Sequence, residues 1–330
     1  MHLLKMERGL YMVKYTIKKL LTLIPKMLAI SLILFMALEA LPGDALSRSV
    51  DPQLYAEMTE AQREERREVL GLNDPTAVRY FRWLTGILKG DFGYSTSTGQ
   101  SIGKMLAGRL PYTMELAFYG LALATILGII LGFLAAIKKN TIIDYLCTTI
   151  SVCGVSLPEF FFGIVWLTVF VLTLHWFPSG GRMPVGDDSF VARIPYMVLP
   201  ISVMAISMTS NLVRYTRSSM LDVLSKDYIK TARSKGMSEV KVNFKHAFRN
   251  ALIPIMTMII GRLPVLVGGS IVIETVFNYA GIGSMAMEAL TAGDIPVVMV
   301  TTMATAVLVL LASTLIDLVT GLLDPRVRFE

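Results

Sequence analysis

Apolar residues gather in six long blocks along the chain, and polar or charged segments separate them. The blocks cover residues 20–38, 113–137, 150–177, 195–216, 253–273 and 297–322. A helix of about 20 apolar residues crosses a hydrocarbon core about 30 Å thick. Each block is long enough for one crossing and carries few or no charges. The pattern therefore predicts an all-α membrane protein with six transmembrane helices.

The segments between the blocks differ in charge, and the difference orients the helices. Basic residues dominate segment 1–19, the 138–144 turn and segment 214–252, where nine Lys and Arg face three acids. Segment 178–194 is neutral, and 274–296 is acidic. Because cytoplasmic loops carry an excess of Lys and Arg, both termini are predicted to be cytoplasmic. The start of the chain lacks a small-residue cleavage site, so block 20–38 is expected to stay as the first helix.

Overall composition changes this picture little. The net charge of +6 and the pI of about 9.2 come from loops between apolar blocks, so nucleic-acid binding is not expected. The apolar content of 54% and the mean hydropathy of +0.59 agree with a membrane protein. Cys147 and Cys153 lie in one apolar stretch and are interpreted as packing residues. No metal site and no disulfide framework is expected.

The segment 39–111 faces outside in this topology, and its turn residues predict three short helices. The first opens at Thr59-x-x-Gln62 and ends at Gly71, the second opens at Asp74-Pro75 and ends before Gly90, and the third opens at Ser101 and stops before Pro111. The segment is predicted to be a small helical extracytoplasmic insertion. Two interpretations stay open: a solvated connection between two spans, or a docking surface for an external partner.

The basic loop 217–252 predicts a pair of helices. Residues 220–235 suit a helix that stops at Gly236, and Ser238 suits the start of a second helix toward Pro254. Ala232 and Gly236 are small, so a partner surface can approach the backbone closely. A rigid helix pair suits a lever that transmits motion of a docked protein into the adjoining spans. The alternative is a positively charged loop that contacts anionic lipid.

This loop resembles the coupling segment of ABC-importer permeases, in particular those of the dipeptide/oligopeptide/nickel family. The family shows a Tyr-x-x-Thr-Ala-Arg-x-Lys-Gly string followed by His-Ala-x-x-Asn-x-x-x-Pro. The matches are Tyr228, Thr231, Ala232, Arg233, Lys235, Gly236, His246, Ala247, Asn250 and Pro254. Where the wider importer motif has Glu-Ala-Ala, this chain has Lys230, Thr231 and Ala232. That departure fits the peptide branch better than the sugar or metal-oxyanion branches.

Further strings of the same family occur in the expected order along nearly the whole chain. They are Leu41-Pro-Gly-Asp44, Leu70-Gly-Leu72, Gly90-Asp-Phe-Gly-Tyr-Ser95, Arg109-Leu-Pro-Tyr-Thr113, Glu274-Thr-Val-Phe277, Gly281-Ile-Gly283, Asp294-Ile-Pro296 and Leu323-Asp-Pro-Arg326. Each string alone is weak, whereas all of them in order are specific. The resemblance therefore extends from the first span to the last.

The resemblance implies the ABC-importer permease (type I) fold, with a five-helix permease core at 112–330 behind the insertion 39–111. It implies import of dipeptides or oligopeptides, with nickel or another metal chelate as the alternative. The implied partners are a homologous or identical second permease, two cytoplasmic ATPase subunits that hold ATP and Mg, and an extracytoplasmic substrate-binding protein. The implied location is the inner membrane of a bacterial or archaeal cell, where lipid surrounds the spans.

The resemblance also implies roles for particular residues. ATPase coupling is expected of Tyr228, Thr231, Ala232, Arg233, Lys235, Gly236, His246 and Asn250. Contact with the binding protein is expected of Asp91, Tyr94, Glu274 and Asp294. No cofactor is expected on this chain, because it has no Gly-x4-Gly-Lys-Ser/Thr phosphate loop. Energy is therefore expected to come from another subunit.

Two charged residues within the apolar blocks bear on rival functions. Arg262 precedes Pro264 near the middle of the fifth block, and Glu159 follows Pro158 in the third. They are candidates for the translocation path, where Arg262 would attract a peptide carboxylate, or for an ion pair with each other. An ion-coupled secondary transporter would use such residues on broken helices. An intramembrane enzyme needs a catalytic pair at depth, and none is visible, so no catalytic residue is expected.

Overall fold

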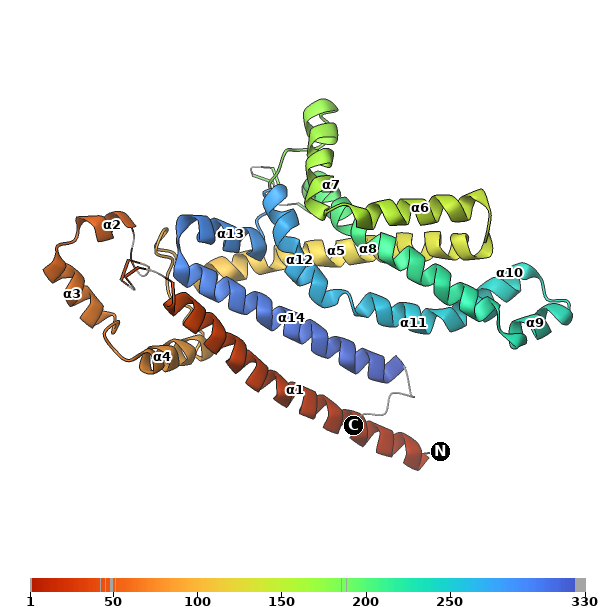
Figure 1. Cartoon of the computed structure of the whole chain (residues 1–330), viewed down its shortest axis with the longest axis horizontal. Coiled ribbons are helices and arrows are strands. Elements are labelled where there is room, and N and C mark those ends of the chain that lie inside the picture. The colour runs from red at the N-terminus through yellow and green to blue at the C-terminus, as the bar shows by residue number, and fades with distance from the viewer. Residues whose placement is uncertain are drawn as a thin grey trace. The chain divides into compact units, whose positions relative to one another are not determined.

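The computed structural model describes residues 2–41, 43–44, 46–47, 50, 52–184, 186–187 and 189–323. For residues 2–13, 52, 267, 269 and 320–323 it describes the backbone alone. Within these ranges the chain is helical, apart from turns and one isolated β-bridge between Tyr94 and Ser101 (Figure 1). Pro42 of the first family string and residues 324–326 of the last string lie outside the described residues.

The helices follow one another in the order that Figure 1 shows. In the first half they are α1 (His2–Glu39), α2 (Pro52–Glu57), α3 (Glu60–Val69), α4 (Thr76–Leu88), α5 (Ile102–Ile137), α6 (Ile142–Ser156) and α7 (Glu159–Trp166), which a π-helix, η1 (Leu167–Thr173), extends. In the second half they are α8 (Phe190–Leu224), α9 (Asp227–Ser234), α10 (Glu239–Lys241), the π-helix η2 (Val242–Phe248), α11 (Arg249–Ile260), α12 (Leu263–Val276), α13 (Ile282–Ala292) and α14 (Ile295–Leu323).

Five helical segments are long and apolar enough to cross a membrane, and a bent pair makes a sixth. The five are residues 14–39 of α1, α5, α8, the segment 239–266 and residues 295–319 of α14. The sixth consists of α6 and α7 with η1, which meet at an angle of 100°. The prediction of one continuous helix over 150–177 is therefore wrong. Pro158 explains the bend, because a proline forces the preceding residue out of helical geometry, and Leu157 has φ −110° and ψ 142°.

Three other predicted helix boundaries also differ from the structure. The helix predicted over 220–235 is broken, since α8 runs to Leu224 and α9 begins at Asp227. The helix that begins after Ser101 does not stop before Pro111 but continues through it to Ile137. In the fifth block the helix passes Pro254 and ends at Ile260, and α12 begins only after Arg262. The predicted span 253–273 is thus broken near its middle, with Pro264 in the first turn of the second piece.

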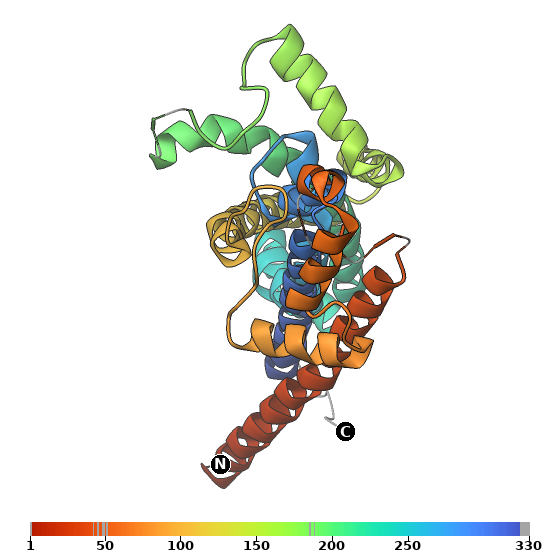
Figure 2. The ribbon, with the colours of Figure 1, turned by 90° about the vertical axis from the view of Figure 1, so that its left-hand side faces the viewer.

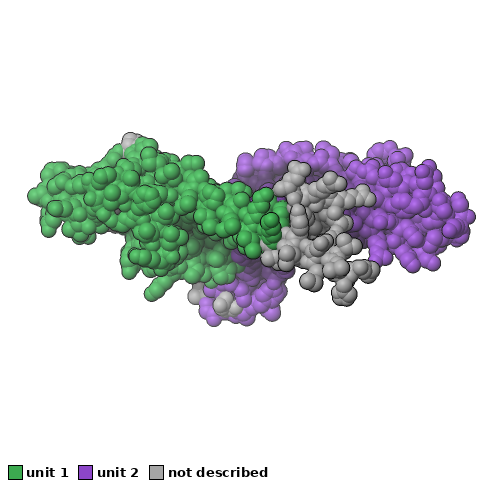
Figure 3. Space-filling view, turned by 90° about the horizontal axis from the view of Figure 1, so that it is seen from below, with its two compact units in different colours: residues 1–113, 280–311 green, residues 114–279, 312–330 purple. Residues whose placement is uncertain are grey.

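The chain forms two compact units, which Figure 3 colours separately. One unit contains residues 1–113 and 280–311, and the other contains residues 114–279 and 312–330. The boundaries fall inside α5, between α12 and α13, and inside α14. The predicted insertion 39–111 lies in the first unit together with α1, α13 and the beginning of α14.

In the first unit, local signals fix the small helices of residues 52–88. Thr59 and Gln62 form the predicted capping box, because the Thr59 side chain accepts from the Gln62 amide and the Gln62 side chain accepts from the Thr59 amide. Gly71 ends this helix with φ of +63°, a conformation that glycine adopts without a Cβ clash. The described part of the unit also has a core in which Ile102 packs with Met285 and Val297.

In the second unit, small residues of α5 and α6 let α8 approach closely. A Cβ at Gly128 would lie 2.7 Å from the Leu212 side chain, and one at Gly132 would lie 2.7 Å from the Val213 carbonyl oxygen. This spacing of small residues is the usual way in which membrane helices pack at short range. Beside it, the buried Asp144 carboxylate accepts two hydrogen bonds from Arg217, at 2.6 and 2.7 Å, and ties the start of α6 to α8.

Candidate functional sites: a basic hairpin and a cluster of loop strings

A basic hairpin, residues 225–248, connects α8 to α11. It contains α9, a turn at Gly236, and the return through α10 and η2. Gly236 has φ of +75°, which the predicted stop signal requires of a helix end. Across the turn, the Arg233 guanidinium donates to both carboxylate oxygens of Glu239, at 2.8 and 3.1 Å. This bidentate pair holds the two arms of the hairpin together.

The inner face of the hairpin packs into a hydrophobic core. Ile229 is fully buried and Ala232 is 8% exposed, and they pack in one cluster with Met220 of α8 and with Val242 and Ala247 of η2. Residues of α5 and α11 complete this cluster. Ala232 therefore packs inward, and its small size serves the core of the hairpin. Because α8, the hairpin and α11 share one core, they are built to move together.

The outer face of the hairpin is exposed and carries most of the predicted coupling residues. Tyr228, Thr231 and Lys235 are exposed. Two large apolar side chains that the sequence analysis missed, Val240 and Phe244, are 69% and 57% exposed. Both follow Ser238, the predicted start of the second helix, and this position was the only sign in the sequence that they belong to the hairpin. The exposed residues of the hairpin thus include both basic and apolar groups.

The remaining two predicted coupling residues lie where the hairpin joins α11. The Asn250 side-chain amide donates to the His246 carbonyl oxygen at 2.6 Å. The His246 Nε2 atom is buried and has no hydrogen-bond partner among the described residues. Both residues therefore belong to the joint between the exposed turn and the fifth span.

Arg262 and Glu159, the two path candidates, are not brought together. Within the described residues no ion pair joins them, and the Glu159 carboxyl instead lies close to the Ser207 side chain of α8. Arg262 sits at the interruption between α11 and α12, where its backbone carbonyl accepts from Leu266. A partly exposed arginine at a break in a predicted span remains a candidate for the path.

Two family strings that lie far apart in the sequence are bonded to each other in the first unit. The Ser95 hydroxyl donates to the Asp294 carboxylate at 2.5 Å, and the amides of Thr96 and Ser97 donate to it at 3.3 and 3.2 Å. Burial raises the pKa of Asp294, but these hydrogen bonds lower it more, so the carboxyl titrates below its usual range. Asp294 thus holds the 95–97 turn at the start of α14.

A second pair of strings meets in the same unit. The Ile282 amide donates to the Thr113 hydroxyl at 2.9 Å, and this bond joins the Arg109–Thr113 string to the Gly281–Gly283 string. Beside it, Arg109 pairs with Glu288 of α13 at 2.9 Å. Sequence reasoning listed these strings one by one and missed that they bind one another in pairs. The only sign of these bonds in the sequence was that all the strings occur in one family.

The four residues expected to contact a binding protein differ in accessibility. Tyr94 is 69% exposed, and Asp91 is exposed with its carboxylate bound to the Gly93 amide at 3.0 Å. Glu274 is fully buried, and Asp294 is 2% exposed and surrounded by the donors described above. Asp91 and Tyr94 are therefore the members of this set that a partner can touch without a rearrangement.

A buried charged cluster in the second unit also escaped the sequence analysis. Glu115 of α5 lies 3.7 Å from Arg182 and 3.5 Å from Arg193, and it accepts a hydrogen bond from Tyr279 at 3.4 Å. All four side chains are largely buried. The loop 178–194 is neutral overall, and this balance of charge conceals two arginines that share one carboxylate.

Neither metal chemistry nor cysteine chemistry adds a site in the part of the chain that is described. No group of three or more His, Cys, Asp or Glu residues there is arranged to hold a metal ion. Cys147 packs beside Ala135 and Val213, as expected, whereas Cys153 is exposed on α6. The packing role predicted for Cys153 is therefore wrong within this chain.

The fold is that of ABC-importer permeases. The chain is similar in structure to an amino acid ABC transporter crystallised with histidines (TM-score 0.53, 14% identity, 66% of this chain and 94% of that chain). It is also similar to the MetNI methionine ABC transporter in inward-facing form (TM-score 0.52, 15% identity, 67% and 96%). At this level of identity the likeness concerns the fold alone.

Sequence comparison extends over nearly the whole chain. The oligopeptide transport system permease protein AppB of Bacillus subtilis is 38% identical over 96% of this chain and 100% of its own length. The glutathione transport system permease protein GsiC of Salmonella paratyphi A is 34% identical over 97% and 100%. Residues 12–117 match the model of the amino-terminal region of binding-protein-dependent transport membrane components, and residues 128–329 match the model of the main region. The chain therefore belongs to the family of binding-protein-dependent transport system inner membrane components.

Proposed function

We propose that this chain is the transmembrane permease subunit of an ATP-driven importer for dipeptides and oligopeptides. The observation that carries the proposal is the end-to-end match with a permease for oligopeptides and one for glutathione, itself a short peptide. The subunit forms half of a translocation path with a second permease, homologous or identical. Two cytoplasmic ATPase subunits, which hold ATP and Mg, and an extracytoplasmic binding protein complete the importer.

The loop charges support an orientation with both termini and the basic hairpin on the cytoplasmic side of the inner membrane. In this orientation the residues 39–111 face outward as an insertion. The exposed pair Asp91 and Tyr94 then faces the binding protein, and Arg262 lies along the path of the peptide. The hairpin faces the ATPases.

The hairpin supports a coupling mechanism with three steps. An ATPase subunit docks on the outer face, where Tyr228, Lys235 and Phe244 are exposed. When ATP binding draws the two ATPases together, the hairpin moves as one body, because its inner face is packed and its turn is held by the Arg233–Glu239 pair. The motion reaches α8 and α11 through their shared core. The path then changes from inward-open to outward-open and accepts the peptide.

Uptake by cells that lack this chain tests the proposal. We expect uptake of a labelled tripeptide to fall at least tenfold, with free amino acid uptake unchanged, and to return when the chain is supplied again. ATP depletion should stop peptide uptake, whereas a protonophore at preserved ATP should not. Loss of nickel-chelate uptake with normal peptide uptake would assign the chain to metal import. Sensitivity to the protonophore alone would indicate a secondary transporter.

A further inference from the structure

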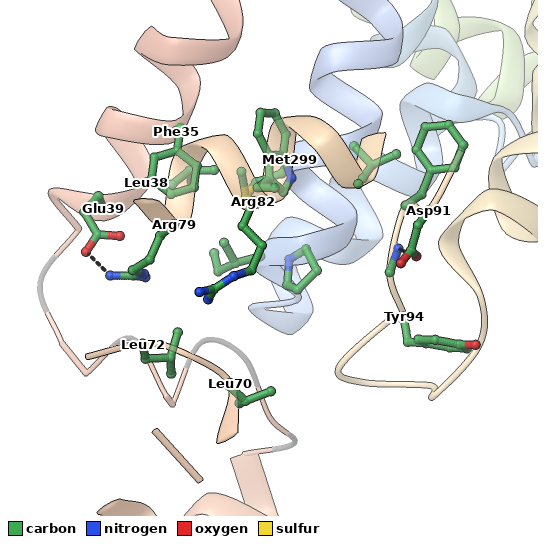
Figure 4. Close-up of a pocket in the computed structure, with 17 residues that line it drawn as sticks. Phe35, Leu38, Glu39, Leu70, Leu72, Arg79, Arg82, Asp91, Tyr94 and Met299 are labelled. Atoms are coloured by element: carbon green, nitrogen blue, oxygen red, sulfur yellow. Dashed lines mark hydrogen bonds and ion pairs between the residues drawn. The ribbon is translucent and has the colours of Figure 1, made fainter. Parts of the chain in front are cut away.

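The first unit contains a cavity of about 410 Å³ beside α4 (Figure 4). This volume lies within the range of small-molecule sites, roughly 300–1,000 Å³. Its apolar lining comes from Phe35 and Leu38 of α1, Trp83 of α4, and Met299 of α14. Its polar lining comes from Glu39, Arg79, Arg82 and Asp91. The cavity therefore has an apolar side and a charged side.

The contact of α4 with α1 places this cavity at the end of the α1 span, at the edge of a lipid leaflet. The two helices are in contact, and Figures 1 and 2 show them side by side. The Tyr80 hydroxyl is hydrogen bonded to Ser31 at 2.8 Å. Ser31 lies eight residues before Glu39, the last residue of the spanning helix, which is about 12 Å along a helix. Half of a hydrocarbon core is about 15 Å, so Tyr80 reaches α1 inside the leaflet.

The opposite side of α4 carries an apolar stripe that suits acyl chains. Val78, Phe81 and Leu88 are 46%, 61% and 77% exposed and share one face of the helix. On its inner side α4 packs Tyr80 and Trp83 against Phe35, with ring centroids 5.5 and 5.9 Å apart. A short helix with apolar side chains on the outside and Tyr and Trp against a span is typical of the membrane interface.

Within the cavity, the polar and apolar linings follow the layers of the leaflet. Phe35 lies one turn inside Glu39 on α1, and Met299 lies one turn inside Ile295 on α14. The apolar lining thus faces the hydrocarbon, whereas Glu39 is the last residue of its helix and Asp91 lies outside the candidate spans. A molecule that fills the cavity therefore needs a chain on one side and a polar group on the other.

The charged residues that line the cavity form its rim, and they determine which polar group of a bound molecule fits there. The four charged lining residues are two acids and two bases, so the rim is neutral overall. Glu39 pairs with Arg79 at 2.7 Å, and Arg82 pairs with Asp74 outside the cavity. Asp91 makes no ion pair within the described residues, and Figure 4 shows it on a different segment from Arg82. A headgroup with one positive and one negative charge fits this rim better than an anionic one.

We propose that the cavity binds a zwitterionic phospholipid from the leaflet in which α4 lies. One acyl chain packs on Phe35, Trp83 and Met299, the phosphate binds Arg82, and the ammonium group binds Asp91. The site requires only that α1 spans the membrane, and it is independent of the transported substrate and of the orientation of the chain. A lipid bound at Asp91 takes this carboxylate from the surface proposed to face the binding protein, where Tyr94 stays exposed.

The fluorescence of Trp83 tests the depth of the cavity. The chain has three tryptophans, so replacing Trp166 and Trp176 with Phe leaves Trp83 as the single reporter. In nanodiscs of 6,7-dibrominated phosphatidylcholine, we expect its emission to fall at least twofold relative to unbrominated lipid, with little quenching by iodide. Full quenching by iodide and none by brominated lipid would place α4 in water and overturn the proposal.

Native mass spectrometry of the purified chain, without substitutions, tests the ligand. From an equal mixture of phosphatidylethanolamine and phosphatidylglycerol, we expect the chain to retain the zwitterionic lipid. Asp91→Asn should lower that retention at least fivefold, and Glu68→Gln, an exposed acid of the same insertion, should leave it unchanged. Gly86→Leu should fill the cavity, because a Cβ there meets only the Asp91 carbonyl oxygen at 3.4 Å.

Three results would contradict the lipid assignment. One is equal retention of both lipids, and another is retention that Gly86→Leu does not lower. The third is binding of a dipeptide to the purified chain, without retained lipid, that Gly86→Leu abolishes. That result would identify the cavity as a peptide-binding site.

Discussion

At the scale of single residues, a few buried side chains join segments that are far apart in the sequence. Asp294 accepts from the Ser95 hydroxyl and from two amides of the turn that follows it. The sequence placed Asp294 on an acidic outer hairpin, and nothing local indicated its burial. Thr59 and Gln62, by contrast, were predicted correctly, because a capping box joins residues only three positions apart.

Asp294→Ala should loosen the 95–97 turn. The change leaves one buried hydroxyl and two amides without their acceptor, and each lost bond of this kind costs about 1–3 kcal/mol. We expect hydrogen exchange of the 94–100 segment to rise at least tenfold. The contribution is constant near neutral pH, because the lowered pKa keeps the carboxyl ionised, and it is lost only as the pH falls below the ordinary value of 3.8.

Glu288→Ala provides the matched control for this prediction. Glu288 also makes an ion pair in the first unit, with Arg109, but its side chain is 54% exposed. Exposed pairs contribute about 0–1 kcal/mol, so exchange in the 94–100 segment should change less than threefold. Equal effects of the two substitutions would show that Asp294 has no special part in holding the turn.

At the scale of helices, the apolar blocks predicted which segments span the membrane, and the prolines bear on where each helix ends. Pro158 breaks the third block, whereas Pro111 and Pro254 lie inside continuous helices. A proline removes one backbone hydrogen bond in either case. Whether the helix continues depends on the packing around it, and that packing is not visible in a local pattern. Helix boundaries were therefore the least predictable part of the fold.

The hairpin supports a prediction at the same scale. Gly236→Trp should lower ATP-driven uptake at least tenfold with normal insertion, because a side chain there has open space and projects toward the docked ATPase. Gly236→Ala separates bulk from backbone strain, since any side chain at φ of +75° costs about 1–2 kcal/mol. Uptake and ATPase assays on both variants distinguish the effect of a bulky side chain from that of backbone strain. Equal loss in the two would mean that the backbone, and not the docking surface, was disturbed.

At the scale of the whole molecule, the loop charges predict a topology that a pair of cysteine variants can test. In a background without Cys147 and Cys153, Glu68→Cys should react with an impermeant maleimide in intact cells. Lys235→Cys at the hairpin should react only after the membrane is permeabilised. Both positions are exposed, so access from one side or the other decides the result. The reverse pattern would invert the proposed orientation.

The six apolar blocks and the family strings were enough to predict the class of molecule, since both depend on residues close together in sequence. The hydrogen bonds between strings could not be predicted, because they depend on how the whole chain folds. The buried cluster of Glu115, Arg182 and Arg193 is a similar case, since its members come from separate segments. The coupling hairpin lies between these extremes: its turn was predicted, and its buried face was not.

The bond between Ser95 and Asp294 has a consequence for biosynthesis. The two residues are 199 positions apart. Ribosomes add about 5–20 residues per second, so Ser95 waits roughly 10–40 s for its partner to be made. During that time the turn after Gly93 lacks its Asp294 partner, and the spanning helices before α14 enter the membrane without this bond. A nascent chain that stalls before α14 therefore leaves the 95–97 turn without the acceptor that holds it in the finished protein.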